Sequence, residues 1–75
     1  MASPRDRYYE LVLGKIRDDH YPSGELMDRL EASLASPEEL EEYLEVLLDK
    51  IEGDHYPSKQ MLDRVLALAV ALEAA

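Results

Sequence analysis

The sequence contains an internal repeat with a period of 35 residues. When residues 8–30 are aligned with residues 43–65, twelve of the 23 pairs are identical. The string "DHYPS" stands at 19–23 and again at 54–58, and most remaining pairs exchange one apolar residue for another, such as Leu11 with Val46. Chance would give about one identity, so the chain carries a duplication. Both copies must therefore build the same supersecondary unit.

Each copy is predicted to open with a helix. Ser3 precedes Pro4 and Ser36 precedes Pro37, and both pairs are typical helix starts. The serine hydroxyl accepts a hydrogen bond from a free N–H group of the first turn, and proline is tolerated at the first helical position. Apolar residues then recur at helical spacing, and in the second copy they are Leu40, Leu44, Leu47 and Ile51.

The repeated "DHYPS" string is predicted to be a short linker between two helices. Pro22 and Pro57 cannot lie inside a helix and bias the preceding tyrosine toward an extended conformation. Ser23 and Ser58 can then cap the next helix. Gly53 suits the left-handed position that often follows a helix end. The restarted helices are predicted to run from about Ser23 to Ala35 and from about Ser58 to Ala74. The apolar stripe predicted to line the second of them comprises Met61, Leu62, Val65, Leu68 and Leu72.

The pattern predicts an all-α fold, a four-helix domain built from two tandem, sequence-similar helical hairpins. A single domain over residues 1–75 is expected, with internal repeat 1 at 3–35 and internal repeat 2 at 36–75. Because one hairpin has an apolar face with nothing to cover it, we expect the two hairpins to pack face to face with pseudo-two-fold symmetry.

Composition limits the classes of partner. The formal net charge is −9, with 17 acidic and 8 basic residues. Nucleic-acid phosphates and anionic membrane surfaces are disfavoured because both are bound through lysine and arginine. The sequence has no cysteine, no apolar signal core at its start and no apolar run long enough for a membrane span. We therefore expect a cytoplasmic protein whose partner is another protein.

Two histidines are the strongest candidates for a metal-binding or catalytic role. His20 and His55 follow Asp19 and Asp54 in the repeated string, and four such ligands would suit zinc if they converged. The linkers of two antiparallel hairpins are expected at opposite ends of the domain, however. Each histidine also stands just past a helix end, where it can donate to free carbonyl groups. We favour this structural role and expect no metal site and no cofactor.

Four tyrosines are also paired by the repeat. Tyr21 and Tyr56 can stack a ligand, but a tyrosine before a helix start more often packs as the apolar end of a hydrophobic staple. Tyr8 and Tyr43 are expected at the edge of the core with their hydroxyl groups in water. Packing is therefore the favoured interpretation for all four.

Two predicted helices carry surface residues whose pattern folding alone does not require, one row acidic and the other apolar. An acidic row on the third helix comprises Glu38, Glu42, Glu45, Asp49 and Glu52. It is either a solvated face that keeps the protein soluble or a docking site for a basic partner. The fourth helix contains "VLALAVAL", in which Leu66 and Val70 point away from the predicted core stripe. Either this helix is central in the bundle, or these two residues contact another chain.

These features predict a non-enzymatic, acidic protein–protein interaction module that can self-associate. Enzymatic activity is not expected, because Ser3, Ser23, Ser36 and Ser58 all read as helix caps and no glycine-rich phosphate loop is present. Two alternatives stay open. One is a metal-binding or regulatory protein that uses the repeated Asp-His-Tyr-Pro-Ser segment, and the other is an acidic inhibitor of a nucleic-acid-binding protein.

Overall fold

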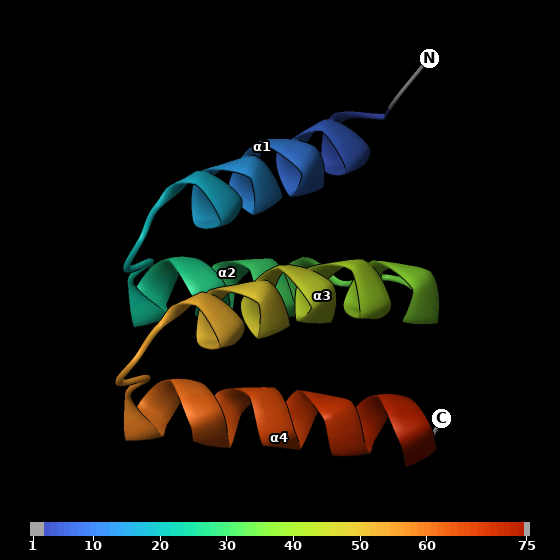
Figure 1. The fold of residues 1–75 in the computed structure, drawn as a ribbon. Helices are drawn as coiled ribbons and strands as arrows, with labels where there is room; N and C mark the ends of the chain where they lie inside the picture. The colour runs from blue at the N-terminus through green and yellow to red at the C-terminus, as the bar shows by residue number, and fades with distance from the viewer. Residues whose placement is uncertain (1–2, 75) are drawn as a thin grey trace. The chain divides into compact units, whose positions relative to one another are not determined.

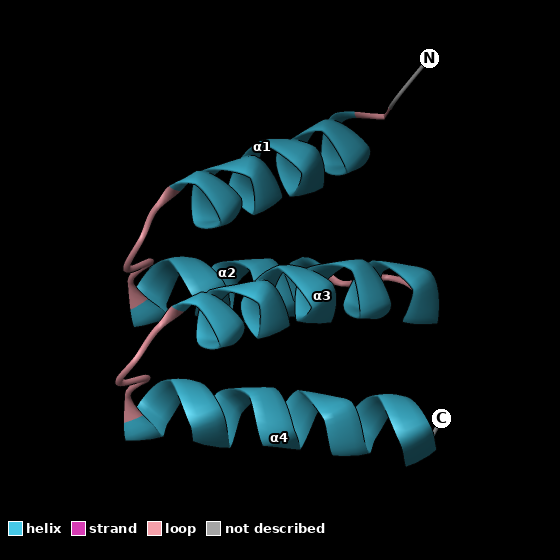
Figure 2. Ribbon diagram, in the orientation of Figure 1, coloured by secondary structure: helices cyan, strands magenta, loops and turns pink. Residues whose placement is uncertain are grey.

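Helices joined by short loops make up residues 3–74, which are the residues that the computed structural model describes (Figures 1 and 2). These residues form four helices and no strand, which confirms the predicted fold class. The helices are α1 (Pro4–Asp18), α2 (Gly24–Ser33), α3 (Pro37–Gly53) and α4 (Lys59–Ala74). Residues 1, 2 and 75 of the predicted domain lie outside the described part.

The helices are grouped in two units along the chain. The first unit ends at Ala35 and the second begins at Ser36. Helix α1 packs against α2 in the first unit, and α3 packs against α4 in the second. Each unit is therefore a helical hairpin whose two helices are joined by one copy of the repeated string.

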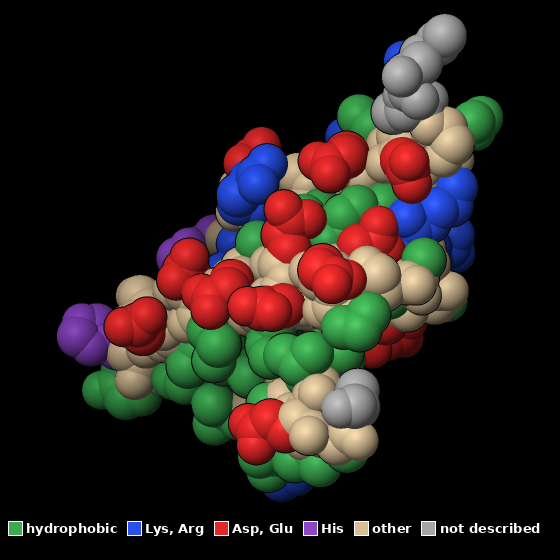
Figure 3. Space-filling model, turned by 90° about the vertical axis from the view of Figure 1, so that its right-hand side faces the viewer, with side chains coloured by type: hydrophobic (Ala, Val, Ile, Leu, Met, Phe, Trp, Pro, Cys, Tyr) green, Lys and Arg blue, Asp and Glu red, His purple; other side chains and the backbone are tan. Residues whose placement is uncertain are grey.

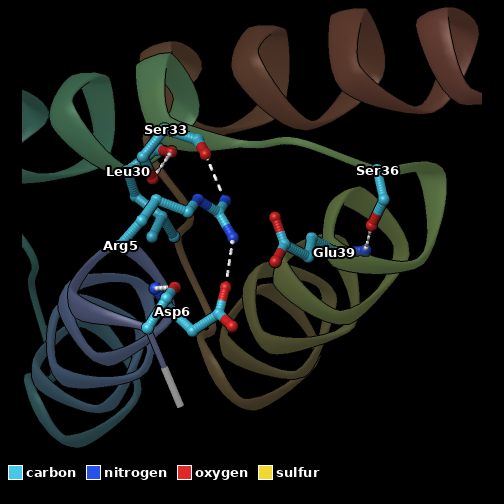
Figure 4. Close-up of polar contacts among 7 residues, drawn as sticks. Arg5, Asp6, Leu30, Ser33, Ser36 and Glu39 are labelled. Carbon is cyan, nitrogen blue, oxygen red and sulfur yellow. Dashed lines mark hydrogen bonds and ion pairs between the residues drawn. The ribbon is translucent and has the colours of Figure 1, made fainter.

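A serine precedes every helix and caps it. In each case the serine Oγ accepts a hydrogen bond from the backbone N–H group three residues further on. The donors are Asp6 for Ser3 and Leu26 for Ser23, each at 3.1 Å, Glu39 for Ser36 at 3.2 Å (Figure 4) and Met61 for Ser58 at 3.1 Å. The serine carbonyl accepts from the next residue along, so two N–H groups of every first turn are satisfied.

Helices α1 and α3 end without a left-handed residue. Their C-caps are Asp19 and Asp54, both in extended conformation, and no described residue has a positive φ angle. Gly53 is the last helical residue of α3, so the prediction that it occupies the left-handed position is wrong. The carboxylate of the next aspartate turns the chain instead, as described below for the two loops, and a left-handed residue is not needed.

The first hairpin has a core that draws on both of its helices. The buried apolar side chains are Tyr9, Val12, Leu13 and Ile16 from α1 and Met27 and Leu30 from α2. Burial of such a side chain contributes about 1.5–3 kcal/mol to the free energy of unfolding.

Arg5 joins the start of α1 to the end of α2. Its guanidinium group donates a hydrogen bond to the carbonyl oxygen of Ser33 (Figure 4). The same group lies 5.4 Å from the centre of the Tyr9 ring. The Ser33 hydroxyl donates to the Leu30 carbonyl at 2.7 Å. Helix α2 has no basic residue in its own last turn, so a residue of α1 supplies the positive charge that a helix C-terminus favours.

The second hairpin has a more one-sided core. Its fully or nearly buried side chains are Tyr43, Leu44 and Leu47 from α3, whereas α4 contributes only Val65. Leu62, which the apolar stripe assigned to the core, is exposed instead. Equivalent positions of the repeat also differ, because Tyr8 is exposed and Tyr43 is completely buried. The expectation of an edge position with a wet hydroxyl group is therefore wrong for Tyr43.

Replacing Gly53 by alanine is expected to stabilise the protein by about 0.5–1 kcal/mol. The backbone of Gly53 is helical, and an added Cβ would meet nothing within 4 Å. The equivalent position of the first copy, Asp18, already carries a side chain at the end of α1. Urea unfolding followed by circular dichroism measures the change. A loss of stability would show that Gly53 needs the left-handed conformation after all.

Replacing Ser23 or Ser58 by alanine is expected to cost about 0.5–2 kcal/mol each, because one N–H group of the following helix loses its acceptor. Replacement by glycine at the same position serves as a matched control and is expected to cost only a few tenths of a kcal/mol. Chemical denaturation of the four variants tests this. Equal stability of wild type and the alanine variants would contradict the capping role.

Candidate functional site

The two copies of the repeated string form loops with the same hydrogen bond. The Asp19 Oδ1 atom accepts from the Tyr21 N–H group at 3.2 Å, and the Asp54 Oδ1 atom accepts from the Tyr56 N–H group at 3.2 Å. An aspartate that binds the backbone two residues on mimics a backbone turn. Each aspartate therefore reverses the chain between helices, a role that the sequence patterns did not single out.

The aromatic residues of these loops extend into solvent. Tyr21 is 73% exposed and Tyr56 is 92% exposed, so the prediction that they pack as the apolar end of a staple is wrong. The imidazole of His20 lies edge-on to the Tyr21 ring at 4.4 Å, while His55 and Tyr56 are 6.4 Å apart. Within residues 3–74 neither imidazole donates to a helix-end carbonyl group. The expected histidine cap is replaced by the aspartate turn.

The loops do not assemble a metal-ligand set. Within residues 3–74, no three His, Asp or Glu side chains lie close enough together to hold one ion. Each loop offers one imidazole and one carboxylate, and that carboxylate already binds the backbone. Structural zinc sites use four ligands.

The acidic row of α3 is a solvent-facing surface. Its five members, Glu38, Glu42, Glu45, Asp49 and Glu52, are all exposed. Their spacing places them on the side of the helix away from the buried residues Tyr43, Leu44 and Leu47. Acidic side chains are prominent on the face of the protein shown in Figure 3. The row adds negative potential to a chain that is already strongly acidic, which opposes aggregation.

Helix α4 has a row of aliphatic side chains that face solvent. Leu62, Leu66 and Val70 follow one another at intervals of four residues and are 44%, 65% and 59% exposed. Residues four apart lie above one another on a helix, so the three form one continuous strip about 12 Å long, here called the α4 row. Ala67, Ala71 and Ala74 beside it are exposed as well. Hydrophobic side chains are plainly visible on the surface in Figure 3.

Sequence reasoning found two of the three members of this row. Leu66 and Val70 were predicted to point away from the core, whereas Leu62 was assigned to it. The spacing of four between Leu62 and Leu66 was the signal that could have revealed its position. Among its described residues, α4 buries Val65 alone.

Comparison with known proteins gives no family to which the chain can be assigned. No family model, no curated protein and no solved structure matches it. None of the helices described is both long and apolar enough to cross a membrane.

Zinc at micromolar concentration is expected to leave the melting temperature unchanged at neutral pH. A ligand that binds only the folded state raises stability by RT ln(1 + [L]/Kd), and one imidazole in each loop gives little affinity. Thermal unfolding followed by circular dichroism, with and without zinc, measures this. A rise of several degrees that disappears in His20→Ala or His55→Ala would instead establish a metal site.

Proposed function

We propose that the chain is a non-enzymatic protein–protein interaction module that binds through the α4 row. The observation that carries this proposal is the exposure of Leu62, Leu66 and Val70 in one uninterrupted line. Single exposed aliphatic residues are common on protein surfaces, whereas contiguous apolar patches usually mark a binding surface. Complete burial of each side chain would contribute about 1.5–3 kcal/mol.

The internal repeat provides a comparison within the same chain. Position 66 of the second copy corresponds to Glu31 of the first, and position 70 corresponds to Ala35. Leu62 corresponds to Met27, which is buried. The α4 row is thus a property of the second copy alone. Helix α2 ends at Ser33, so the first hairpin forms without a helical residue at the position that corresponds to Val70.

The small size of the second hairpin also supports association. Chains of this length bury a smaller fraction of their surface on folding than larger domains do, and some gain stability by forming oligomers. Helix α4 spans 16 residues but buries only one of them. A partner that covers the α4 row would give this helix a second buried face.

The charge of the chain supports a protein as the partner. A net charge of −9 repels nucleic-acid phosphates and anionic lipid headgroups. A neutral apolar row on an acidic chain is better suited to the apolar face of another helix. Because the chain has no cysteine, its folding needs no oxidising compartment, which supports a cytoplasmic location.

The pseudo-two-fold relation between the hairpins stays a prediction. The repeat supports it, since similar sequences with the same capping bonds favour similar hairpins. The unequal exposure of Tyr8 and Tyr43 must be reconciled with it, because a two-fold axis would give equivalent residues similar surroundings.

A photocrosslinking amino acid at Ala67, beside the α4 row, is expected to form a covalent adduct with a protein in the cells that produce this chain. The same probe at Ala32, an exposed position of α2, is the matched control and is expected to form none. Adding Leu66→Glu with Val70→Lys should abolish the adduct, while circular dichroism shows the helices retained. If the Ala67 probe forms no adduct beyond the control, the α4 row is not a binding surface.

A further inference from the structure

We propose that the partner of the α4 row is α4 of a second copy of this chain, antiparallel to the first and related to it by a two-fold axis at Leu66. This inference rests on the proposed function and specifies the partner for the same surface. It follows from the order of residues along the exposed face of α4 and from the charges at its two ends.

The exposed face of α4 is self-complementary. Among its exposed residues, the α4 row and the two charged residues near its ends lie at 59, 62, 66, 70 and 73, so their intervals read 3, 4, 4 and 3 from either end. In a two-fold antiparallel pair, a residue before Leu66 meets the residue equally far after the partner's Leu66. Leu62 therefore meets the partner's Val70, and Lys59 meets the partner's Glu73. Apolar residues pair in the middle and opposite charges pair at both ends.

Helix α4 has a basic residue at its N-terminal end and an acidic residue near its C-terminal end, which is the opposite of what an isolated helix favours. Acidic residues stabilise the positive N-terminal end of a helix and basic residues stabilise the negative C-terminal end. Helices α1, α2 and α3 all have acidic residues in the first turn, and α1 and α3 have basic residues in the last turn. Helix α4 has neither, since it begins at Lys59 and has Glu73 next to its end.

An antiparallel partner turns these unfavourable charges into favourable ones. Lys59 then lies beside the negative C-terminal end of the partner's α4, and Glu73 lies beside the positive N-terminal end. Lys59 already forms an exposed ion pair with Asp63 at 2.8 Å, which holds its ammonium group near the row. A parallel pair would place Lys59 against the partner's Lys59 and Glu73 against the partner's Glu73, which costs free energy.

Charge reversal at the two ends provides the first test. Sedimentation equilibrium should show the wild type as a dimer, with Lys59→Glu and Glu73→Lys each dimerising about tenfold more weakly, because each places two like-charged pairs in the dimer. An equimolar mixture of the two variants should regain wild-type affinity, since the mixed dimer has opposite charges at both ends. Both substitutions lie on exposed positions near the helix ends, so the variants are expected to stay folded.

Engineered cysteines provide the test of direction, and the native chain has no cysteine to interfere. A mixture of Leu62→Cys and Val70→Cys proteins should form a disulfide between the two variants under mild oxidation. Neither variant alone should crosslink, because in this arrangement two copies of position 62 are about 12 Å apart along the helix axis. Disulfides need Cα atoms within about 7 Å. A parallel pair predicts the reverse pattern.

The outcomes separate this inference from the proposed function. A wild type that stays monomeric at millimolar concentration overturns the second copy as partner. An adduct at Ala67 with a different protein overturns it as well, but leaves the interaction module intact. The antiparallel arrangement is overturned if the Leu62→Cys protein forms a disulfide with a second copy of itself, or if the mixture of the two cysteine variants forms no disulfide. It is also overturned if charge reversal at Lys59 or Glu73 leaves the dimerisation affinity unchanged. If the probe at Ala67 forms no adduct, both the interaction module and the second copy as its partner are overturned.

Discussion

The structure depends on the pair of hydrogen bonds that turns the chain between two helices. In both loops an aspartate carboxylate binds the N–H group two residues on, and a serine hydroxyl then binds the first turn of the next helix. Between them stands a proline that cannot join either helix. Together they determine where one helix ends and the next begins, and hence which residues of the two helices face each other. The packing within each hairpin follows from that register.

The two hairpins share this turn but differ in how their helices bury side chains. The first hairpin buries residues from both helices and is tied by Arg5 at the end opposite to its loop. The second has a helix that is six residues longer than its counterpart and has one buried side chain. Since the loops are the same, the difference arises from residues outside them. The turn is common to both hairpins, whereas the exposed aliphatic row belongs to α4.

The features that sequence patterns predicted are local ones. Serine before a helix, proline within a linker and apolar residues at intervals of three and four all act within a few residues, and they predict the four helices. The features missed depend on the rest of the fold. Burial of Tyr43 and exposure of Leu62 are decided by which helix faces are covered, and the Arg5 bond joins residues 28 positions apart. Gly53 was misassigned because glycine permits a left-handed residue without requiring one.

The tie between Arg5 and Ser33 has a consequence for synthesis of the chain. It completes the first hairpin using residues up to 35 only. Ribosomes add about 5–20 residues per second, so the second copy follows over several seconds. Helical proteins with local contacts fold in microseconds to milliseconds. Because the first hairpin leaves the ribosome before the second, it can form while the α4 row is still being made or is still inside the ribosome.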